Sequence, residues 1–164
     1  MARFEHSSHA TVVGDDIFVF VTEHEIRAAT RMRYPVSLLA VQPQLLGAPQ
    51  AGISGDVIDR LATALSAILR KTDLIRQPRD TTWLHILLVG APLESLPGII
   101  QRIVVEVDAQ RFLIEGNETV ATLSVGGACF PTSATTATEL ITRADALAEE
   151  ARRDDQAGRR YRLR

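Results

Sequence analysis

The sequence predicts an α/β (α+β) sandwich, in which helices flank a central, mostly antiparallel sheet of about five strands plus a hairpin. Two observations carry this prediction. Apolar runs of strand length alternate with amphipathic segments of helical period, and turn signals join neighbouring runs into hairpins. The resulting order is helix, strand, helix, hairpin, helix, hairpin, helix, strand, which favours helices packed on an antiparallel sheet. The 164 residues fit one domain with a sizeable core.

The N-terminal part predicts one helix and one strand. Thr22 and Glu25 form a capping-box pattern, so a first helix is expected from Thr22 to about Arg33, before Pro35. Residues 1–20 are expected to be an N-terminal extension, and residues 21–164 a single domain. Val36–Val41 has the continuous apolar character of a buried strand, and three glycine or proline breaks predict a loop from Gln42 to Gly55.

The rest of the chain alternates between the same two kinds of element. Three further helices are expected, at Asp56–Leu69, Leu93–Ala109 and Thr138–Arg153. Five further strands are expected, at Thr72–Gln77, Trp83–Val89, Phe112–Ile114, Thr119–Phe130 and Arg160–Leu163, with polar turns at Pro78–Thr82 and Glu115–Glu118.

Composition excludes several classes of function. A net charge of −2 argues against a nucleic-acid partner, and no apolar run approaches the length of a membrane span. A single cysteine, Cys129, and the lack of a signal-peptide pattern predict a cytoplasmic protein. No metal site is expected, because His24 and His85 have no second ligand at metal spacing and His6 and His9 lie in the extension.

Two stretches carry a resemblance to a known family. Residues 122–164 read TLSVGGACFP, ELITRADALAEEARR and AGRRYRLR, and residues 34–41 read YPVSLLAV. The chain thereby resembles a GGDEF domain, the catalytic fold of bacterial diguanylate cyclases, over roughly residues 23–164. The resemblance implies a nucleotidyl-cyclase-like sandwich and a role in cyclic di-GMP signalling.

The same resemblance implies that catalysis is lost. The family's Gly-Gly-Asp/Glu-Glu-Phe signature falls on Arg79-Asp80-Thr81-Thr82-Trp83, which lacks the glycines that admit phosphates. Its metal-binding carboxylates are also replaced, and Gln42 stands where the family has a second metal-binding aspartate. Arg152 and Arg159 are rough equivalents of the family's phosphate-contacting basic residues. We therefore expect no cyclase activity, no bound metal and no cofactor.

A second ligand site is partly retained. Many GGDEF domains bind their product, cyclic di-GMP, through Arg-x-x-Asp placed just before the signature hairpin, and Arg70-Lys71-Thr72-Asp73 has this pattern. Arg102 matches a further arginine that often joins that site. A purely structural interpretation remains open: Arg70 could favour a helix dipole, and Asp73 could cap a turn or pair with Lys71 or Arg76.

Three hypotheses about function follow. The chain is an inactive GGDEF-like domain that serves as a cyclic di-GMP receptor or a protein-interaction module; or it is a scaffold for another protein and binds no nucleotide; or it is a divergent nucleotidyl cyclase. A protein partner or a homodimer is expected in the first two cases. The missing carboxylates count against the third.

Overall fold

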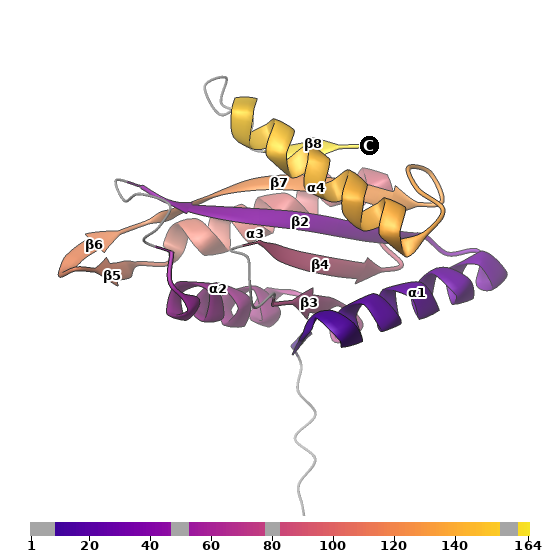
Figure 1. Cartoon of the computed structure of the whole chain (residues 1–164), viewed down its shortest axis with the longest axis horizontal. Coiled ribbons are helices and arrows are strands. Elements are labelled where there is room, and N and C mark those ends of the chain that lie inside the picture. Colours follow the sequence, from indigo (N-terminus) through magenta and orange to yellow (C-terminus); the bar gives the residue numbers. More distant parts are fainter. Residues whose placement is uncertain (1–8, 47–52, 78–82, 155–160) are drawn as a thin grey trace, which may run out of the picture.

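The protein forms a sheet of six strands with helices on both faces (Figure 1). The structure is a computed structural model and describes residues 9–46, 53–77, 83–154 and 161–164. The helices are α1 (Asp15–Met32), α2 (Gly55–Ile68), the short 3₁₀ helix η2 (Leu93–Ser95), α3 (Leu96–Ala109) and α4 (Ala137–Arg153). The strands are β1 (Thr11–Val13), β2 (Val36–Leu45), β3 (Leu74–Arg76), β4 (Leu84–Val89), β5 (Phe112–Ile114), β6 (Asn117–Thr119), β7 (Ala121–Phe130) and β8 (Tyr161–Leu163).

The strand pairing confirms the predicted fold class. The order in the sheet is β1-β3-β4-β2-β7-β8, and its three central pairs, β3–β4, β4–β2 and β2–β7, are antiparallel. The two outer pairs, β1–β3 and β7–β8, are parallel. The sheet is thus one strand larger than the expected five, because β1 joins its edge. The strands β5 and β6 form the separate hairpin.

The start of the fold differs from the prediction. Helix α1 begins at Asp15, and Thr22 lies inside it, where its hydroxyl donates to the Phe18 carbonyl at 2.7 Å instead of capping the helix. The apolar residues around Phe18 have helical period, since Phe18, Thr22 and Ile26 are buried on one face. The predicted extension, residues 1–20, therefore contributes β1 and the first turn of α1 to the domain; residues 1–8 lie outside the described part.

The strand β2 is longer than predicted. It continues to Leu45, so residues 42–45 belong to the sheet and not to the expected loop. Its pairing with β4 ends at Val41, whereas its pairing with β7 continues to Leu45. Pro43 is tolerated because beyond Val41 this strand has a neighbour on one side only, so the missing N–H breaks no second ladder.

The hairpin β5–β6 turns more tightly than expected. The expected turn covered Glu115–Glu118, but Asn117 and Glu118 belong to β6, which leaves Glu115 and Gly116 as the turn. Both have positive φ, 49° and 81°. Positive φ at both central positions is typical of a type I′ turn, whose twist matches that of the strands.

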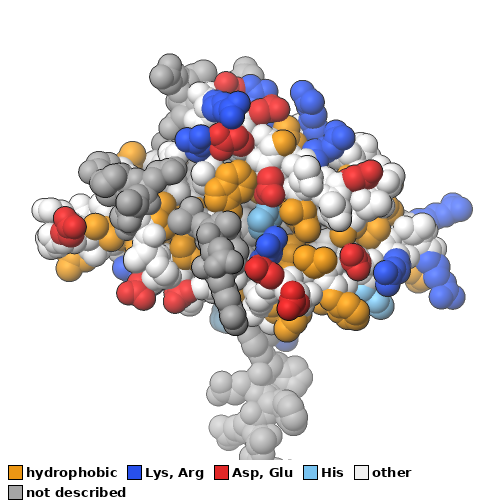
Figure 2. Space-filling model, in the orientation of Figure 1, with side chains coloured by type: hydrophobic (Ala, Val, Ile, Leu, Met, Phe, Trp, Pro, Cys, Tyr) orange, Lys and Arg blue, Asp and Glu red, His pale blue; other side chains and the backbone are white. Residues whose placement is uncertain are grey.

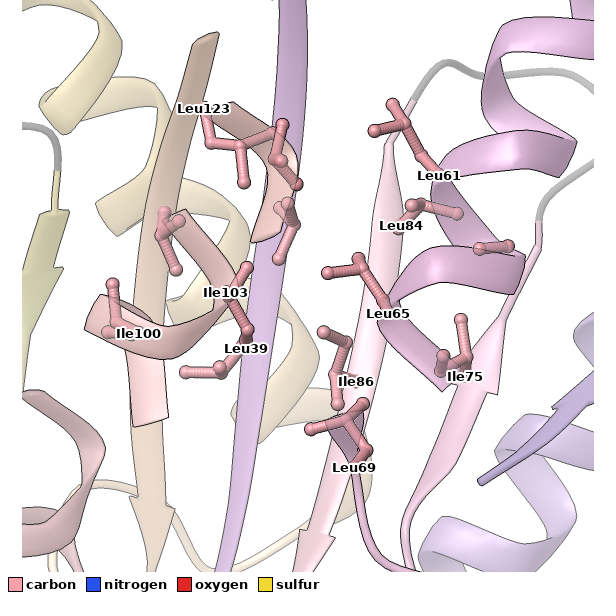
Figure 3. Close-up of a cluster of buried hydrophobic side chains, with 14 of the residues drawn as sticks. Leu39, Leu61, Leu65, Leu69, Ile75, Leu84, Ile86, Ile100, Ile103 and Leu123 are labelled. Atoms are coloured by element: carbon pink, nitrogen blue, oxygen red, sulfur yellow. The ribbon is translucent and has the colours of Figure 1, made fainter. Parts of the chain in front are cut away.

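Two apolar layers hold the helices on the sheet. On one face, α2 and α3 pack against β2, β4 and β7; Figure 3 shows Leu65 of α2 beside Ile86 of β4, and Ile103 of α3 beside Leu39 of β2. On the other face, α1 and α4 cover a second cluster that includes Phe18 and Leu140. Among the described residues, no helix has the length and apolar character needed to span a membrane.

Helix α4 lies directly against the backbone of the sheet. A Cβ added at Gly126 of β7 would overlap the carbonyl oxygen of Ala144 and the amide nitrogen of Ala148. Ala40 of β2 pairs with Gly126 and is fully buried, so two small residues form the floor beneath α4. The close approach of the two backbones therefore requires glycine at position 126.

Candidate functional site

The three residues predicted to bind a ligand line one pocket. Arg70 follows α2, Asp73 precedes β3, and Arg102 lies on α3, yet all three surround a cavity of about 170 Å³. The cavity lies where α2 and β4 end and α3 begins. The fold therefore brings together residues that are 32 positions apart at the extremes (70 to 102).

Asp73 lies at the base of this pocket with only 4% of its surface exposed. Its carboxylate accepts a hydrogen bond from the Arg70 backbone N–H at 2.9 Å and another from the backbone of Val89. Burial raises the pKa of this carboxyl above its usual value, while the two hydrogen bonds and the charges of Arg70 and Arg102 oppose that rise. Two backbone N–H groups thus hold the carboxylate in place, and the charges of Arg70 and Arg102 act on it.

The structural interpretation of Asp73 is confirmed in part. Its backbone N–H donates to the Arg70 carbonyl at 3.0 Å, so Asp73 does close the Arg70–Asp73 turn. The expected alternative of a pair with Arg76 is wrong, because Arg76 donates to Asp15 of α1 at 2.7 Å. The turn fixes the carboxylate and leaves the side chain of Arg70 exposed at the mouth of the pocket.

The remaining walls combine apolar surface with a few polar groups. Leu69, Leu88 and Ile99 supply apolar contacts, and Ser95 supplies a hydroxyl that donates to the Pro92 carbonyl at 2.8 Å. The segment between β4 and η2, which includes Gly90, completes the rim. These residues were not predicted from the sequence; the one local signal was Gly90, directly after an apolar strand, which has a φ of 76°.

This arrangement suits an anionic ligand with a flat ring. Two guanidinium groups can clamp a phosphate in bidentate geometry, and a fixed carboxylate accepts hydrogen bonds from ring N–H groups. Apolar walls accommodate the face of the ring. This cavity combines two arginines with a buried carboxylate.

The region onto which the family signature is expected to fall is only partly described. Arg79, Asp80, Thr81 and Thr82 lie outside the described residues, as does Arg159. Trp83 is described and packs, partly buried, against the apolar cluster under α1 and α4.

Gln42 and Arg152, which were matched from the sequence to the family's metal- and phosphate-binding positions, have particular surroundings. Gln42 is buried on β2, and its side-chain oxygen has no hydrogen-bond partner among the described residues. Arg152 donates twice to Glu149, at 3.0 and 2.5 Å, and this pair raises the pKa of the guanidinium further. A cation already held by a carboxylate one helical turn away has less charge to offer a phosphate.

The histidines and acids do not assemble into a metal site in the described part of the chain. No group of three or more His, Cys, Asp and Glu side chains there could hold a metal ion. His85 of β4 instead pairs with Asp145 of α4, with 2.6 Å between Nε2 and the carboxylate oxygen. This pair ties α4 to the sheet, and the absence of a bound metal stays a prediction.

The sheet with its antiparallel centre and helices on both faces is the α/β sandwich that the sequence predicted. Residues 52–158 match the family model described as diguanylate cyclase, GGDEF domain, which is more than half of the chain. The chain therefore belongs to the GGDEF domain family. The comparison with curated proteins gives no match.

Solved structures agree with this assignment of the fold. The GGDEF domain of YfiN (TpbB) from Pseudomonas aeruginosa is 22% identical, with a TM-score of 0.73 over 87% of this chain and 91% of that one. The GGDEF domain of FimX from Pseudomonas aeruginosa is 23% identical, with a TM-score of 0.73 over 87% and 90%. The GGDEF domain of DgcB from Caulobacter crescentus, in complex with c-di-GMP, is 15% identical, with a TM-score of 0.73 over 93% and 90%.

Proposed function

We propose that this chain is a catalytically inactive GGDEF domain that acts as a cytoplasmic receptor for cyclic di-GMP. The observation that carries the proposal is the pocket in which Arg70 and Arg102 flank the buried carboxylate of Asp73. Cyclic di-GMP offers phosphates to the guanidinium groups, guanine N–H groups to the carboxylate, and guanine faces to the apolar walls. A relative of the same fold, DgcB, has been solved with this ligand.

The proposed loss of catalysis rests on the residues that replace the signature. Phosphoryl transfer depends on metal ions held by carboxylates and on backbone that approaches the phosphates closely. The chain has Thr81 and Thr82 at the carboxylate positions and Arg79 at the first glycine position. Gln42 carries no charge, and Arg152 is engaged by Glu149. Each of these changes weakens the binding of GTP and its metal.

Calorimetric titration with cyclic di-GMP tests the receptor function. We expect saturable heat with the wild-type protein and an affinity about 10- to 100-fold lower for Arg70→Ala, because a hydrogen bond to a charged group contributes roughly 1.5–3 kcal/mol. Lys71→Ala is the matched control, since it removes the same charge from the neighbouring residue, which does not line the pocket. An unchanged affinity in Arg70→Ala would exclude this pocket, and no heat at all would leave the scaffold hypothesis.

Incubation with GTP and Mg²⁺ tests the loss of catalysis separately. We expect chromatography of the reaction to show only unreacted GTP after long incubation at high protein concentration. An active diguanylate cyclase of the family serves as the positive control. Formation of any cyclic dinucleotide by this chain, abolished on removing Mg²⁺, would show that it is an enzyme.

The pH dependence of binding tests the role of Asp73. Burial raises the pKa of this carboxyl, so it takes up a proton at a higher pH than an ordinary aspartate, whose pKa is about 3.9. We expect the affinity for cyclic di-GMP to fall as the pH decreases through this raised pKa, since the neutral form accepts hydrogen bonds less well. Asp73→Asn should bind weakly with no corresponding pH step.

The same pKa shift distinguishes loss of binding from loss of fold. A carboxyl whose pKa is raised in the folded state contributes stability below its unfolded pKa and loses that contribution as the pH rises through the folded pKa. Protonation of Asp73 in mild acid therefore favours the folded state while it weakens ligand binding. A thermal unfolding scan at each pH of the titration makes the comparison. If binding and folding are lost together in mild acid, Asp73 does not control binding.

A further inference from the structure

Helix α1 exposes large apolar side chains on the face that points away from the sheet. Phe18, Ile26 and Ala29 are buried, but Phe20 is 69% and Ile17 57% exposed. Ile17 and Phe20 are three positions apart and are therefore neighbours on the helix surface. An exposed phenylalanine beside an exposed isoleucine on an otherwise charged helix is typical of an interaction surface.

The charges along this outward face are divided between its two halves. Asp16 and Glu23 lie in the first half of the helix, and Arg27 and Arg31 lie in the second. Figure 2 shows the corresponding separation, with blue side chains gathered at the right-hand end, where α1 ends, and red ones nearer its start. On this face Glu23 and Arg27 form an ion pair at 3.9 Å, with both side chains largely exposed.

The charges on this face attract those of a second copy in only one relative orientation of the two helices. A second copy of α1 laid antiparallel brings the acidic half of each helix against the basic half of the other. A parallel copy would bring acid against acid and arginine against arginine, which is unfavourable. The distribution of charge thus selects both the partner and its direction.

We infer that the outward face of α1 pairs antiparallel with α1 of a second copy of this chain. With the twofold axis between Glu23 and His24, equal spacing from the axis places Asp16 opposite Arg31 of the second copy. The same spacing places Phe20 opposite Arg27 of the second copy, where a guanidinium over the ring gives a cation–π contact. Every contact occurs twice, as an isologous interface requires. This inference does not depend on the proposed function.

Sedimentation velocity over a concentration series tests the pairing. We expect a reversible dimer for the wild-type chain, weakened about tenfold or more by Asp16→Arg and by Arg31→Asp, because each puts like charges opposite one another. The double variant Asp16→Arg/Arg31→Asp should recover the wild-type affinity. A monomer at all concentrations, or a double variant no better than the single ones, would overturn the proposal.

A separate variant and control test the apolar side chains on the outward face of α1. Phe20→Glu should abolish the dimer while thermal unfolding of the monomer stays unchanged, since this side chain lies outside the core. Leu113→Glu, at a residue 73% exposed on β5, is the matched control and should dimerise normally. Equal dimerisation of both variants would show that α1 is not the interface.

Cross-linking settles the direction of the pairing. Asp16 and Arg31 are equally far from the proposed axis on opposite sides and lie on the same face of the helix, so they face one another across an antiparallel pair. On mixing Asp16→Cys and Arg31→Cys proteins under mild oxidation, we expect mainly the mixed disulfide dimer. Mainly self-linked dimers of each variant would indicate parallel helices and contradict the proposal. The native Cys129 is buried and does not compete.

Discussion

Replacing Gly126 by alanine is expected to lower the free energy of unfolding by on the order of 3 kcal/mol. The added methyl group would overlap backbone atoms of Ala144 and Ala148, which cannot rotate away as a side chain would. Relief requires α4 to move off the sheet as a unit, and that movement would also disturb the pair between Asp145 and His85. Few single methyl groups should cost this chain as much.

Two other glycines provide a graded comparison. Gly127→Ala should be milder, because the nearest atoms are the ends of the Leu163 and Leu39 side chains, which can shift. Gly98→Ala, in open space on α3, should cause no loss, since alanine favours a helix more than glycine does. Urea unfolding followed by circular dichroism measures all three. Equal stability of Gly126→Ala and Gly98→Ala would contradict the packing described for α4.

Replacing both Arg70 and Arg102 by alanine is expected to abolish measurable binding of cyclic di-GMP. Each guanidinium supplies charge-assisted hydrogen bonds to the phosphates of the ligand, so the double variant loses both sets. Each single variant should weaken binding about 10- to 100-fold by the energies given above. The unfolding free energy should change little, because both side chains are exposed.

Lysine variants separate charge from shape at the same positions. Arg70→Lys and Arg102→Lys keep the positive charge but lose the planar fork that clamps a phosphate. We expect their affinities to lie between those of the wild type and the alanine variants in a calorimetric titration. If the lysine variants bind as tightly as the wild type, the arginines act only as general positive charge. If the double alanine variant still binds normally, the ligand occupies another site.

The C-terminal third and the order of the elements could be predicted because local signals determine them. Helix α4 begins at Ala137, one residue before the predicted start, since Thr136 caps it by accepting from the Glu139 backbone N–H. The elements of the N-terminal part could be predicted less well from the sequence. Whether Ile17–Val21 is strand or helix depends on which face the sheet covers, and the extent of β2 depends on β7, about eighty residues away in sequence. Tertiary contacts therefore determine both the type of the first element and the length of β2.

In the candidate site, too, local sequence patterns predicted some features, and others depended on tertiary packing. Arg70 and Asp73 form a local pattern, and Arg102 was placed by resemblance alone; the fold confirms that all three line one pocket. The burial of Asp73, with its effect on the pKa, could not be read from four residues. Ser95 and the Gly90 segment were missed because their role depends on how α3 approaches β4. The Arg-x-x-Asp pattern identifies the polar groups of the pocket, whereas the residues that form its walls depend on how the helices and strands pack.

The most direct test of the account is an amide NMR titration with cyclic di-GMP, because it reports where the ligand binds. We expect the backbone signals of Gly90, Ser95 and Ile99, which line the pocket, to shift in a saturable way. The signals of Gln42 and Ser124, which pair with each other across β2 and β7 away from the pocket, should stay unchanged. Shifts confined to Gln42 and Ser124, or no shifts at all, would contradict a receptor site at Arg70, Asp73 and Arg102.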